Sequence, residues 1–314
     1  MTQVLKIANS DKKVSEAVAF EMDVVVTADI TNAEGNMTHY EYVRLFTQAV
    51  ERYVGREIAI QATPVNMSFK YIQDILPGQK IIVKLWTHEQ SNKDSIVFMA
   101  EFVNADTAKI HALGVQEIYA EKRNHSFVGK RRESPLVNKQ FKILKEWIAC
   151  ATESKSSAKY VLTVTKTICF GRTTYFGTVS SFEYANIFGE VREVFGLTCI
   201  PQFKKDVGKK FILSTNEANY SIIKHFKFGD KIKTKMWVES SGGASFILRA
   251  EFWNGRHFCG TATQRIGYCD LQTGQLRLPI GLKKQLKMVA GYSKFSFITR
   301  PIIALLMPLK FLWK

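Results

Sequence analysis

The chain of 314 residues carries two similar stretches in the same order, and this internal repeat is the feature that most constrains its fold. The segment Gly35–Phe46 aligns without a gap with Gly177–Phe188. A second block, Ile72–Trp86, parallels Ile223–Trp237 with identical residues at six of its fifteen positions. Chance agreement in separate blocks with the spacing kept is improbable, so we interpret the repeat as one structural unit used twice.

Two units of similar size follow from this repeat. A third block matches Ala100–Phe102 to Ala250–Phe252, which places the copies at residues 18–121 and 159–275. Each copy is long enough for a core of its own, because domains usually contain about 100–200 residues. With 46% hydrophobic and 23% charged residues, the composition is that of a folded globular protein.

Each unit is predicted to contain one long helix followed by short strands. Residues 20–31 are rich in β-branched side chains and predict a strand. Residues 38–54 place apolar side chains at helical spacing over much of the circumference, so this helix should be mostly buried. Turn signals such as Leu76–Gly78 and Asn254–Gly255 separate the later runs. The predicted fold class is therefore α+β, with an antiparallel sheet curved around one buried helix in each unit.

The start of each predicted helix carries a capping signature. Thr38 and Ser180 are residue types that cap helices, and Glu41 and Glu183 follow three residues later. This spacing predicts a capping box, in which each side chain bonds the other residue's backbone N–H.

The net charge of +16 lies mostly outside the two units. The connector, residues 122–158, has eight basic residues and one acid between Lys122 and Lys145, and it is expected to contain a helix. The tail, residues 276–314, has seven basic residues and no acid from Gly281 onward. A nucleic-acid-binding fold would carry its charge on the reading face, so this distribution favours an anionic membrane or an acidic carrier protein over nucleic acid. A solvated linker is the alternative.

The tail ends in an apolar run flanked by basic residues. Ile302–Leu309 is too short to span a bilayer, but nearby lysines and Trp313 fit an anchor lying on anionic lipid. The alternative is that the tail packs on the sheets as an extra strand or helix. We therefore expect a cytoplasmic protein that associates peripherally with the inner face of the membrane, or a cytoplasmic protein without that contact.

Several classes of protein are excluded by missing signals. No run of about 18 apolar residues and no secretory leader is present. The five cysteines include no C-x-x-C pair, which argues against a disulfide framework and a zinc site. Nucleotide-binding loops, a serine nucleophile elbow and a zinc-protease motif are also missing, so chemistry without a cofactor is expected.

In each half, a polar loop ending in glycine leads into a helix. Later in the second half, Phe228–Ile232 forms a hydrophobic–Gly–Asp–Lys–hydrophobic start to a strand. This pattern resembles the hotdog fold of acyl-thioester enzymes, over about 220 of the 314 residues. Because hotdog units work in pairs, the resemblance implies a fused pair. Association of whole chains into a homo-oligomer stays open.

The loop before the first helix narrows this resemblance. Thr31–Met37 followed by Tyr42 is similar to the 4-hydroxybenzoyl-CoA-thioesterase-like group, and in particular to enediyne polyketide thioesterases. Gly189–Glu193 is similar to the Gly-x-x-Arg-Glu segment of that group's helix. The resemblance implies a thioesterase acting on an acyl chain carried by acyl carrier protein or coenzyme A. An acyltransferase of the same fold, or a non-catalytic acyl-binding module, is the alternative.

The implied site needs an Asn in the loop, a Tyr ten residues later and an Arg eighteen residues after the Asn. The first half has Asn32 and Tyr42 but Val50 at the Arg position. The second half has Tyr184 and Arg192 but Thr174 at the Asn position. Neither half is complete, which leaves three possibilities: a composite site between the halves, one working site, or lost chemistry.

Donors fixed in a dry site would stabilise the oxyanion of thioester hydrolysis. Asn32, Tyr42, Tyr184 and Arg192 supply such donors, and Glu34 is a weak candidate base. Thr174 and the loop glycines Gly35 and Gly177 are expected to contact substrate. Each polar residue also has a structural alternative: a satisfied core hydroxyl for the tyrosines, an ion pair for Arg192 and an Asx-turn for Asn32.

Overall fold

We describe the protein from a computed structural model. The structure describes residues 20–31, 37–54, 63–88, 95–119, 161–169, 178–206, 209–274 and 278–290. Within the connector it describes only Lys139, Lys142, Ile143 and Glu146, all with helical backbone.

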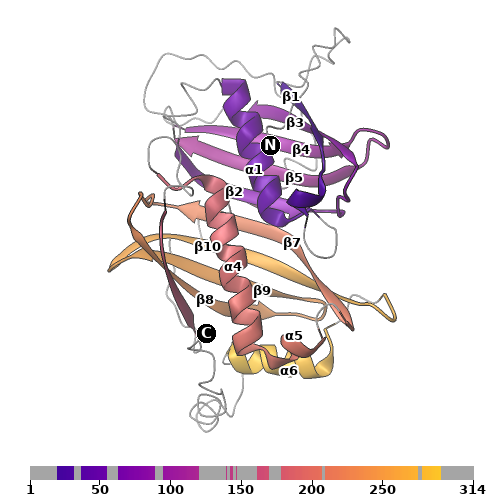
Figure 1. Ribbon diagram of the computed structural model, residues 1–314, viewed down its shortest axis with the longest axis vertical. Helices are drawn as coiled ribbons and strands as arrows, with labels where there is room; N and C mark the ends of the chain where they lie inside the picture. The colour runs from indigo at the N-terminus through magenta and orange to yellow at the C-terminus, as the bar shows by residue number, and fades with distance from the viewer. Residues whose placement is uncertain are drawn as a thin grey trace.

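Ten antiparallel strands form one continuous sheet made of two five-stranded groups (Figure 1). The first group consists of β1 (Phe20–Val25), β2 (Thr63–Tyr71), β3 (Lys80–His88), β4 (Ser95–Asn104) and β5 (Ile110–Tyr119). The second consists of β6 (Leu162–Thr167), β7 (Phe211–Ile222), β8 (Lys231–Ser241), β9 (Ser245–Asn254) and β10 (His257–Asp270). The order β1-β3-β4-β5-β2-β7-β10-β9-β8-β6 places the same succession of strands on either side of the centre.

The two groups join edge to edge through β2 and β7. These strands pair antiparallel from Asn66 opposite Ser221 to Lys70 opposite Glu217. Near the middle of this pairing, the buried Ser68 hydroxyl donates to Asn219 Oδ1 at 2.6 Å. Because β2 and β7 pair through their backbones, the junction between the two groups has no exposed sheet edge.

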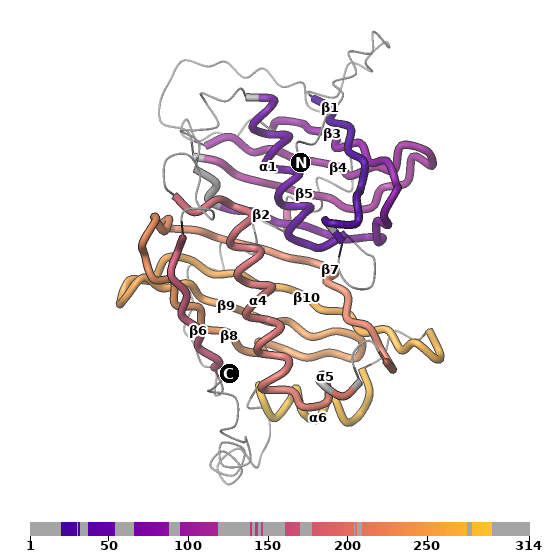
Figure 2. Tube along the Cα trace, in the orientation of Figure 1, coloured from indigo at the N-terminus to yellow at the C-terminus, as the bar shows by residue number. Residues whose placement is uncertain are grey.

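Two long helices lie on the same face of this sheet, one in front of each strand group (Figures 1 and 2). They are α1 (His39–Val54) and α4 (Ser181–Cys199), and they also contact each other. One hydrophobic core runs beneath both helices. Its aromatic contacts repeat: Phe46 meets Phe69 edge to face at 5.7 Å between ring centroids, and Phe188 meets Tyr220 at 6.3 Å.

The capping boxes predicted from the sequence are wrong. The Ser180 side chain makes no cap hydrogen bond, and the buried hydroxyls of Thr38 and Ser180 have no hydrogen-bond partner within the described residues. Glu41 instead accepts a hydrogen bond from Arg44 Nε at 2.5 Å, and Glu183 accepts one from Asn186. Each glutamate therefore bonds a side chain one turn forward along the helix.

Two short helices close the far end of the second unit. The helix α5 (Pro201–Asp206) follows α4 directly, and α6 (Ile280–Val289) lies beside it (Figure 1). Leu282 and Leu286 of α6 are fully buried, so the first part of the predicted tail packs onto the fold as a helix. Residues 291–314 lie outside the described residues.

Candidate functional site

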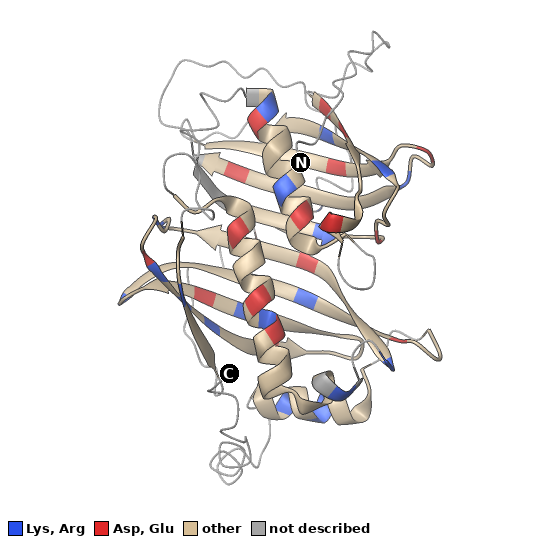
Figure 3. Ribbon diagram, in the orientation of Figure 1, with Lys and Arg blue, Asp and Glu red and all other residues tan. Residues whose placement is uncertain are grey.

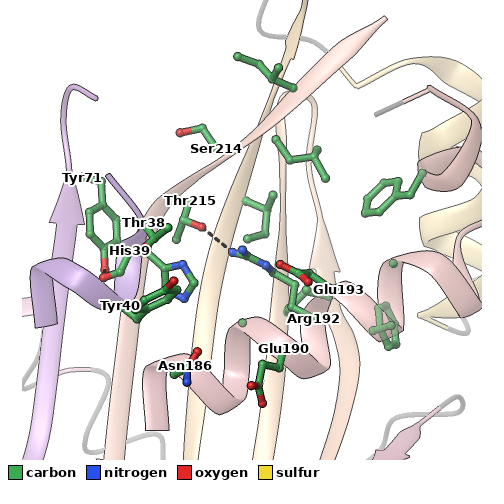
Figure 4. Close-up of a pocket in the computed structure, with 18 of the residues that line it drawn as sticks. Thr38, His39, Tyr40, Tyr71, Asn186, Glu190, Arg192, Glu193, Ser214 and Thr215 are labelled. Carbon is green, nitrogen blue, oxygen red and sulfur yellow. Dashed lines mark hydrogen bonds between the residues drawn. The ribbon is translucent and has the colours of Figure 1, made fainter. Parts of the chain in front are cut away.

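A cleft of about 730 Å³ lies where the two units meet. The start of α1 and the end of β2 form its wall on the side of the first unit (Figure 4). On the side of the second unit, the cleft runs between α4 and strands β7, β9 and β10 toward α5. Its volume lies in the range of about 300–1,000 Å³ that is usual for small-molecule sites.

Arg192 of α4 is held in this cleft by two neutral acceptors. Its Nη1 donates to Thr215 Oγ1 at 2.7 Å (Figure 4) and to Gln264 Oε1 at 2.8 Å. Gln264 in turn donates through Nε2 to the Tyr220 hydroxyl at 3.1 Å, and both of these residues are buried. The guanidinium is therefore fixed in direction while neither of these partners neutralises its charge.

His39, the first residue of α1, faces Arg192 across the cleft (Figure 4). Its Nε2 lies 3.3 Å from the Ala185 carbonyl oxygen of α4, and because a carbonyl only accepts, Nε2 carries the proton. Burial and the nearby Arg192 charge lower the pKa of His39 to about 3. The imidazole is therefore neutral at physiological pH.

Glycine at position 189 lets the two helices approach at this point. A Cβ on Gly189 would lie 3.0 Å from His39 Cε1 and 3.4 Å from Nε2. Such contacts are tighter than ordinary van der Waals packing, so a larger residue would displace the imidazole. The position of His39 beside Arg192 thus depends on a missing side chain in α4.

Two tyrosines stand behind the start of α1. The Tyr71 hydroxyl donates to the His39 carbonyl oxygen at 3.2 Å, and the rings of Tyr42 and Tyr71 meet edge to face at 5.1 Å. Burial raises the pKa of Tyr42 and of Tyr71 well above the usual range. Both phenols are therefore neutral, and the start of α1 is supported from the β2 side.

The residues proposed from the sequence are only partly brought together. Tyr42 and Arg192 line the same cleft although they belong to different halves. Tyr184 lies elsewhere: it packs on Phe252 and its hydroxyl accepts the Phe226 backbone N–H at 3.3 Å. Asn32, Glu34, Gly35, Thr174 and Gly177 lie outside the described residues.

The two described residues that flank positions 32–36 are at the cleft. Thr31 and Met37 form an isolated β-bridge with each other, and both line the cleft.

The positions that the internal repeat relates to this site carry different side chains. Arg192 and His39 line the cleft and Tyr220 lies behind Gln264, whereas the equivalent positions of the repeat hold Val50, Ser181 and Phe69. Gln116 stands opposite Met67 as Gln264 stands opposite Ala218. It has no arginine to accept from, and its Nε2 donates to Ser181 Oγ at 3.4 Å. The group of polar side chains formed by Arg192, Thr215, Gln264, Tyr220 and His39 therefore occurs once in the described part of the chain.

Three of these polar residues are not identified from the sequence. The counterpart of His39 in the repeat is Ser181, so the repeat does not point to His39, although that difference is the sign of an asymmetric pair. Thr215 and Gln264 are polar residues within strands, and no spacing connects them to Arg192 before the sheet is built. A polar residue at a core-facing strand position is the one available signal.

No family model matches the sequence, and no curated protein is significantly similar to it. Solved structures do match over most of the chain. A protein of Lactobacillus plantarum assigned as an oleoyl thioesterase is 8% identical, with a TM-score of 0.59 over 79% of this chain and 94% of that chain. The 12:0-ACP thioesterase from Umbellularia californica is 11% identical, with a TM-score of 0.56 over 79% and 93%.

An acyl-ACP thioesterase from Bacteroides thetaiotaomicron is 12% identical, with a TM-score of 0.55 over 79% of this chain and 97% of that chain. The fold is a double hotdog. The α+β fold class predicted from the sequence is confirmed by these neighbours and by the continuous antiparallel sheet. At these identities the likeness concerns the fold, and the chemistry must come from the cleft itself.

Proposed function

We propose that this protein hydrolyses acyl thioesters at a single composite site between its two hotdog units. The observation that carries the proposal is the fixed Arg192 guanidinium, which lies between the polar start of α1 and an apolar cleft beside α4. A thioester matches this division because it has one polar carbonyl attached to a long apolar chain. The similar folds of the acyl-ACP thioesterases support the same substrate class.

In the proposed mechanism, the thioester carbonyl lies between Arg192 and the first turn of α1. The first N–H groups of a helix have no partner within it and form its positive end. Together with the Arg192 charge they would stabilise the oxyanion that forms when water attacks the carbonyl carbon. The C–S bond then breaks, the thiol leaves with a proton and the carboxylic acid remains.

Water would be activated by a carboxylate. Neutral His39 is a poor base because its pKa is about 3. Glu193 lines the cleft one residue after Arg192, and Glu34 lies in the sequence between Thr31 and Met37, which both line the cleft. Comparison of Glu193→Gln with Glu34→Gln identifies the base, because only its loss removes the acidic limb of the pH–rate profile. Asn32 of the same loop is proposed as a further oxyanion donor.

The test of this function is thiol release from acyl-coenzyme A and acyl-carrier-protein thioesters. Arg192→Met should lower kcat/KM by about 10²–10³-fold, the usual effect of removing one oxyanion donor. The matched control is Arg265→Met, which removes an exposed arginine paired with Glu217 outside the cleft. Full activity in Arg192→Met would disprove the site. Absence of thiol release from every thioester would favour an acyl-binding module or an acyltransferase.

We propose as a second point that the C-terminal segment contacts anionic lipid. Helix α6 carries Lys283, Lys284 and Lys287 and no acidic residue (Figure 3), and Ile280 and Met288 are exposed on it. The chain after it adds four basic residues, no acid and an apolar run. Each basic residue near such a surface contributes about 1 kcal/mol. Within the described residues, no helix combines the length and apolar character needed to cross a membrane.

Vesicle binding tests this second point. Because Leu282 and Leu286 are buried, the deletion should begin after Ala290 so that α6 stays folded. Full-length protein should sediment with phosphatidylserine vesicles and not with phosphatidylcholine vesicles, and the truncated chain should sediment with neither. Equal binding by both chains would remove the membrane proposal and leave the thioesterase proposal untouched.

A further inference from the structure

Much of the cleft lining beside Arg192 is apolar. This part is lined by Phe195, Phe203, Ile212, Phe246, Leu248 and Ile266. Phe203 comes from α5, the short helix directly after α4, and its exposed fraction is 9%. One aromatic side chain of the lining thus belongs to a different helix from the one that carries Arg192.

Phe203 is held in this position from several sides. A Cβ on Gly196 would lie 2.7 Å from Phe203 Cδ2, so the ring packs directly on the α4 backbone. Its centroid lies 6.2 Å from that of Phe211 and 6.0 Å from that of Phe246. The helix α5 is in turn tied to α6, because the Gln202 backbone N–H donates to Gln285 Oε1 at 3.4 Å.

We propose that Phe203 is the residue that sets the maximum length of the acyl chain. This proposal rests on the proposed thioesterase function and deepens it. The acyl chain lies along α4 from the thioester at Arg192 toward Phe203, among the apolar side chains of the cleft. The ring of Phe203 blocks further extension, since Gly196 and Phe246 prevent it from turning aside.

The helix geometry gives the length of this path. From Gly189, opposite His39, to Gly196, opposite Phe203, α4 advances seven residues, or about 10 Å. An extended chain advances about 1.2 Å per bond. The path therefore holds about eight bonds, which corresponds to a medium-length acyl group.

The experiment compares straight-chain saturated acyl-coenzyme A thioesters of increasing length. For wild-type protein, kcat/KM should rise with length and then fall for chains longer than about eight carbons. In Phe203→Ala the rise should continue, at about fourfold for each further methylene that is buried. Phe203→Trp should move the optimum to shorter chains. Phe203→Leu, which keeps an apolar side chain, should give a smaller shift toward longer chains if the alanine variant fails to fold.

The matched control is Phe226→Ala, which removes another buried phenylalanine of the same unit, one that does not line the cleft. It should keep the wild-type length dependence. The proposal is overturned if wild-type protein shows no decline for long chains, if the Phe203 variants keep its optimum, or if Phe226→Ala shifts it equally.

Binding of non-hydrolysable acyl-coenzyme A thioethers of the same lengths separates this proposal from the thioesterase proposal. Calorimetry should show the same shift in optimum length for Phe203→Ala. A shift in binding without thiol release from any thioester would retain the role of Phe203 and reject hydrolysis. Thiol release with an unchanged length dependence in the Phe203 variants would retain hydrolysis and reject the role of Phe203.

Discussion

At the scale of single residues, the decisive difference between the halves is that the first has Val50 where the second has Arg192. In the second unit the arginine has Thr215 and Gln264 as acceptors. In the first unit, Gln116 is the counterpart of Gln264. Its Oε1 is buried without a hydrogen-bond partner among the described residues. A buried acceptor left unpaired costs about 1–3 kcal/mol.

The partly buried His39 predicts a specific dependence of stability on pH. Its pKa falls from 6.5 to about 3 on folding, so between these values the unfolded chain binds a proton that the folded chain does not. Stability should therefore decrease as the pH falls from 6.5 toward 3. In urea unfolding, wild-type protein should lose about 1–2 kcal/mol more than His39→Gln between pH 7 and pH 5. An identical loss in both proteins would show that His39 is not buried as described.

The ionisation of His39 should not influence the catalytic rate near neutral pH. Because its pKa lies far below 6, the pH–rate profile should show no ionisation that disappears in His39→Gln. The variant should lower the rate by perturbing the start of α1 and leave the shape of the profile unchanged. A limb near pH 6.5 that the substitution abolishes would instead identify His39 as a base.

Residue-level prediction from sequence had most to work with where a motif preserved the spacing. Tyr42 and Arg192 were identified by resemblance, and the structure brings them to one cleft from opposite halves. The partners Thr215 and Gln264 were out of reach, because they meet Arg192 only after β7 and β10 pair. Tyr184 occupies the same position of the repeat as Tyr42, yet its hydroxyl accepts a hydrogen bond from the Phe226 backbone N–H.

At the scale of elements, the contact between α1 and α4 determines the geometry of the cleft. The contact is close because Gly189 leaves space for His39. Elsewhere in a helix interior, glycine costs up to about 1 kcal/mol relative to alanine. The glycine at this position therefore indicates a requirement for close approach.

A double-mutant cycle tests this requirement. Gly189→Ala alone should destabilise the protein by about 1 kcal/mol or more, because the new Cβ would press on His39. In a His39→Ala background the same substitution should stabilise the protein by up to about 1 kcal/mol, since only helix propensity remains. Chemical denaturation of the four proteins measures both values. The same sign in both backgrounds would contradict the proposed contact.

The long elements were largely predictable because their periodicity is strong. The helix expected at residues 38–54 is observed as His39–Val54, and the turn glycines Gly78 and Gly229 both have positive φ, at 83° and 84°. The short helices α5 and α6 were not predicted as such. Their position depends on the space left at the end of α4, which no local pattern encodes.

At the scale of the whole molecule, the protein is an unlike pair of hotdog units, and in the described part of the chain the polar side chains around Arg192 occur once. Calorimetric titration with a non-hydrolysable acyl-coenzyme A thioether should therefore give one equivalent per chain. Arg192→Met should weaken this binding, and Val50→Ala, at the opposite place, should leave it unchanged. Two equal sites per chain would show that the first unit also binds substrate through its own helix and strands.

The pairing of β2 with β7 within one chain has a consequence for how such an unlike pair can exist. Separate halves in solution would also combine like with like, and their correct partnership would vary with dilution. Covalent continuity raises the local concentration of the proper partner and makes its assembly independent of expression level. Each half is thereby free to specialise, one presenting a helix terminus and the other an arginine and a lipophilic channel.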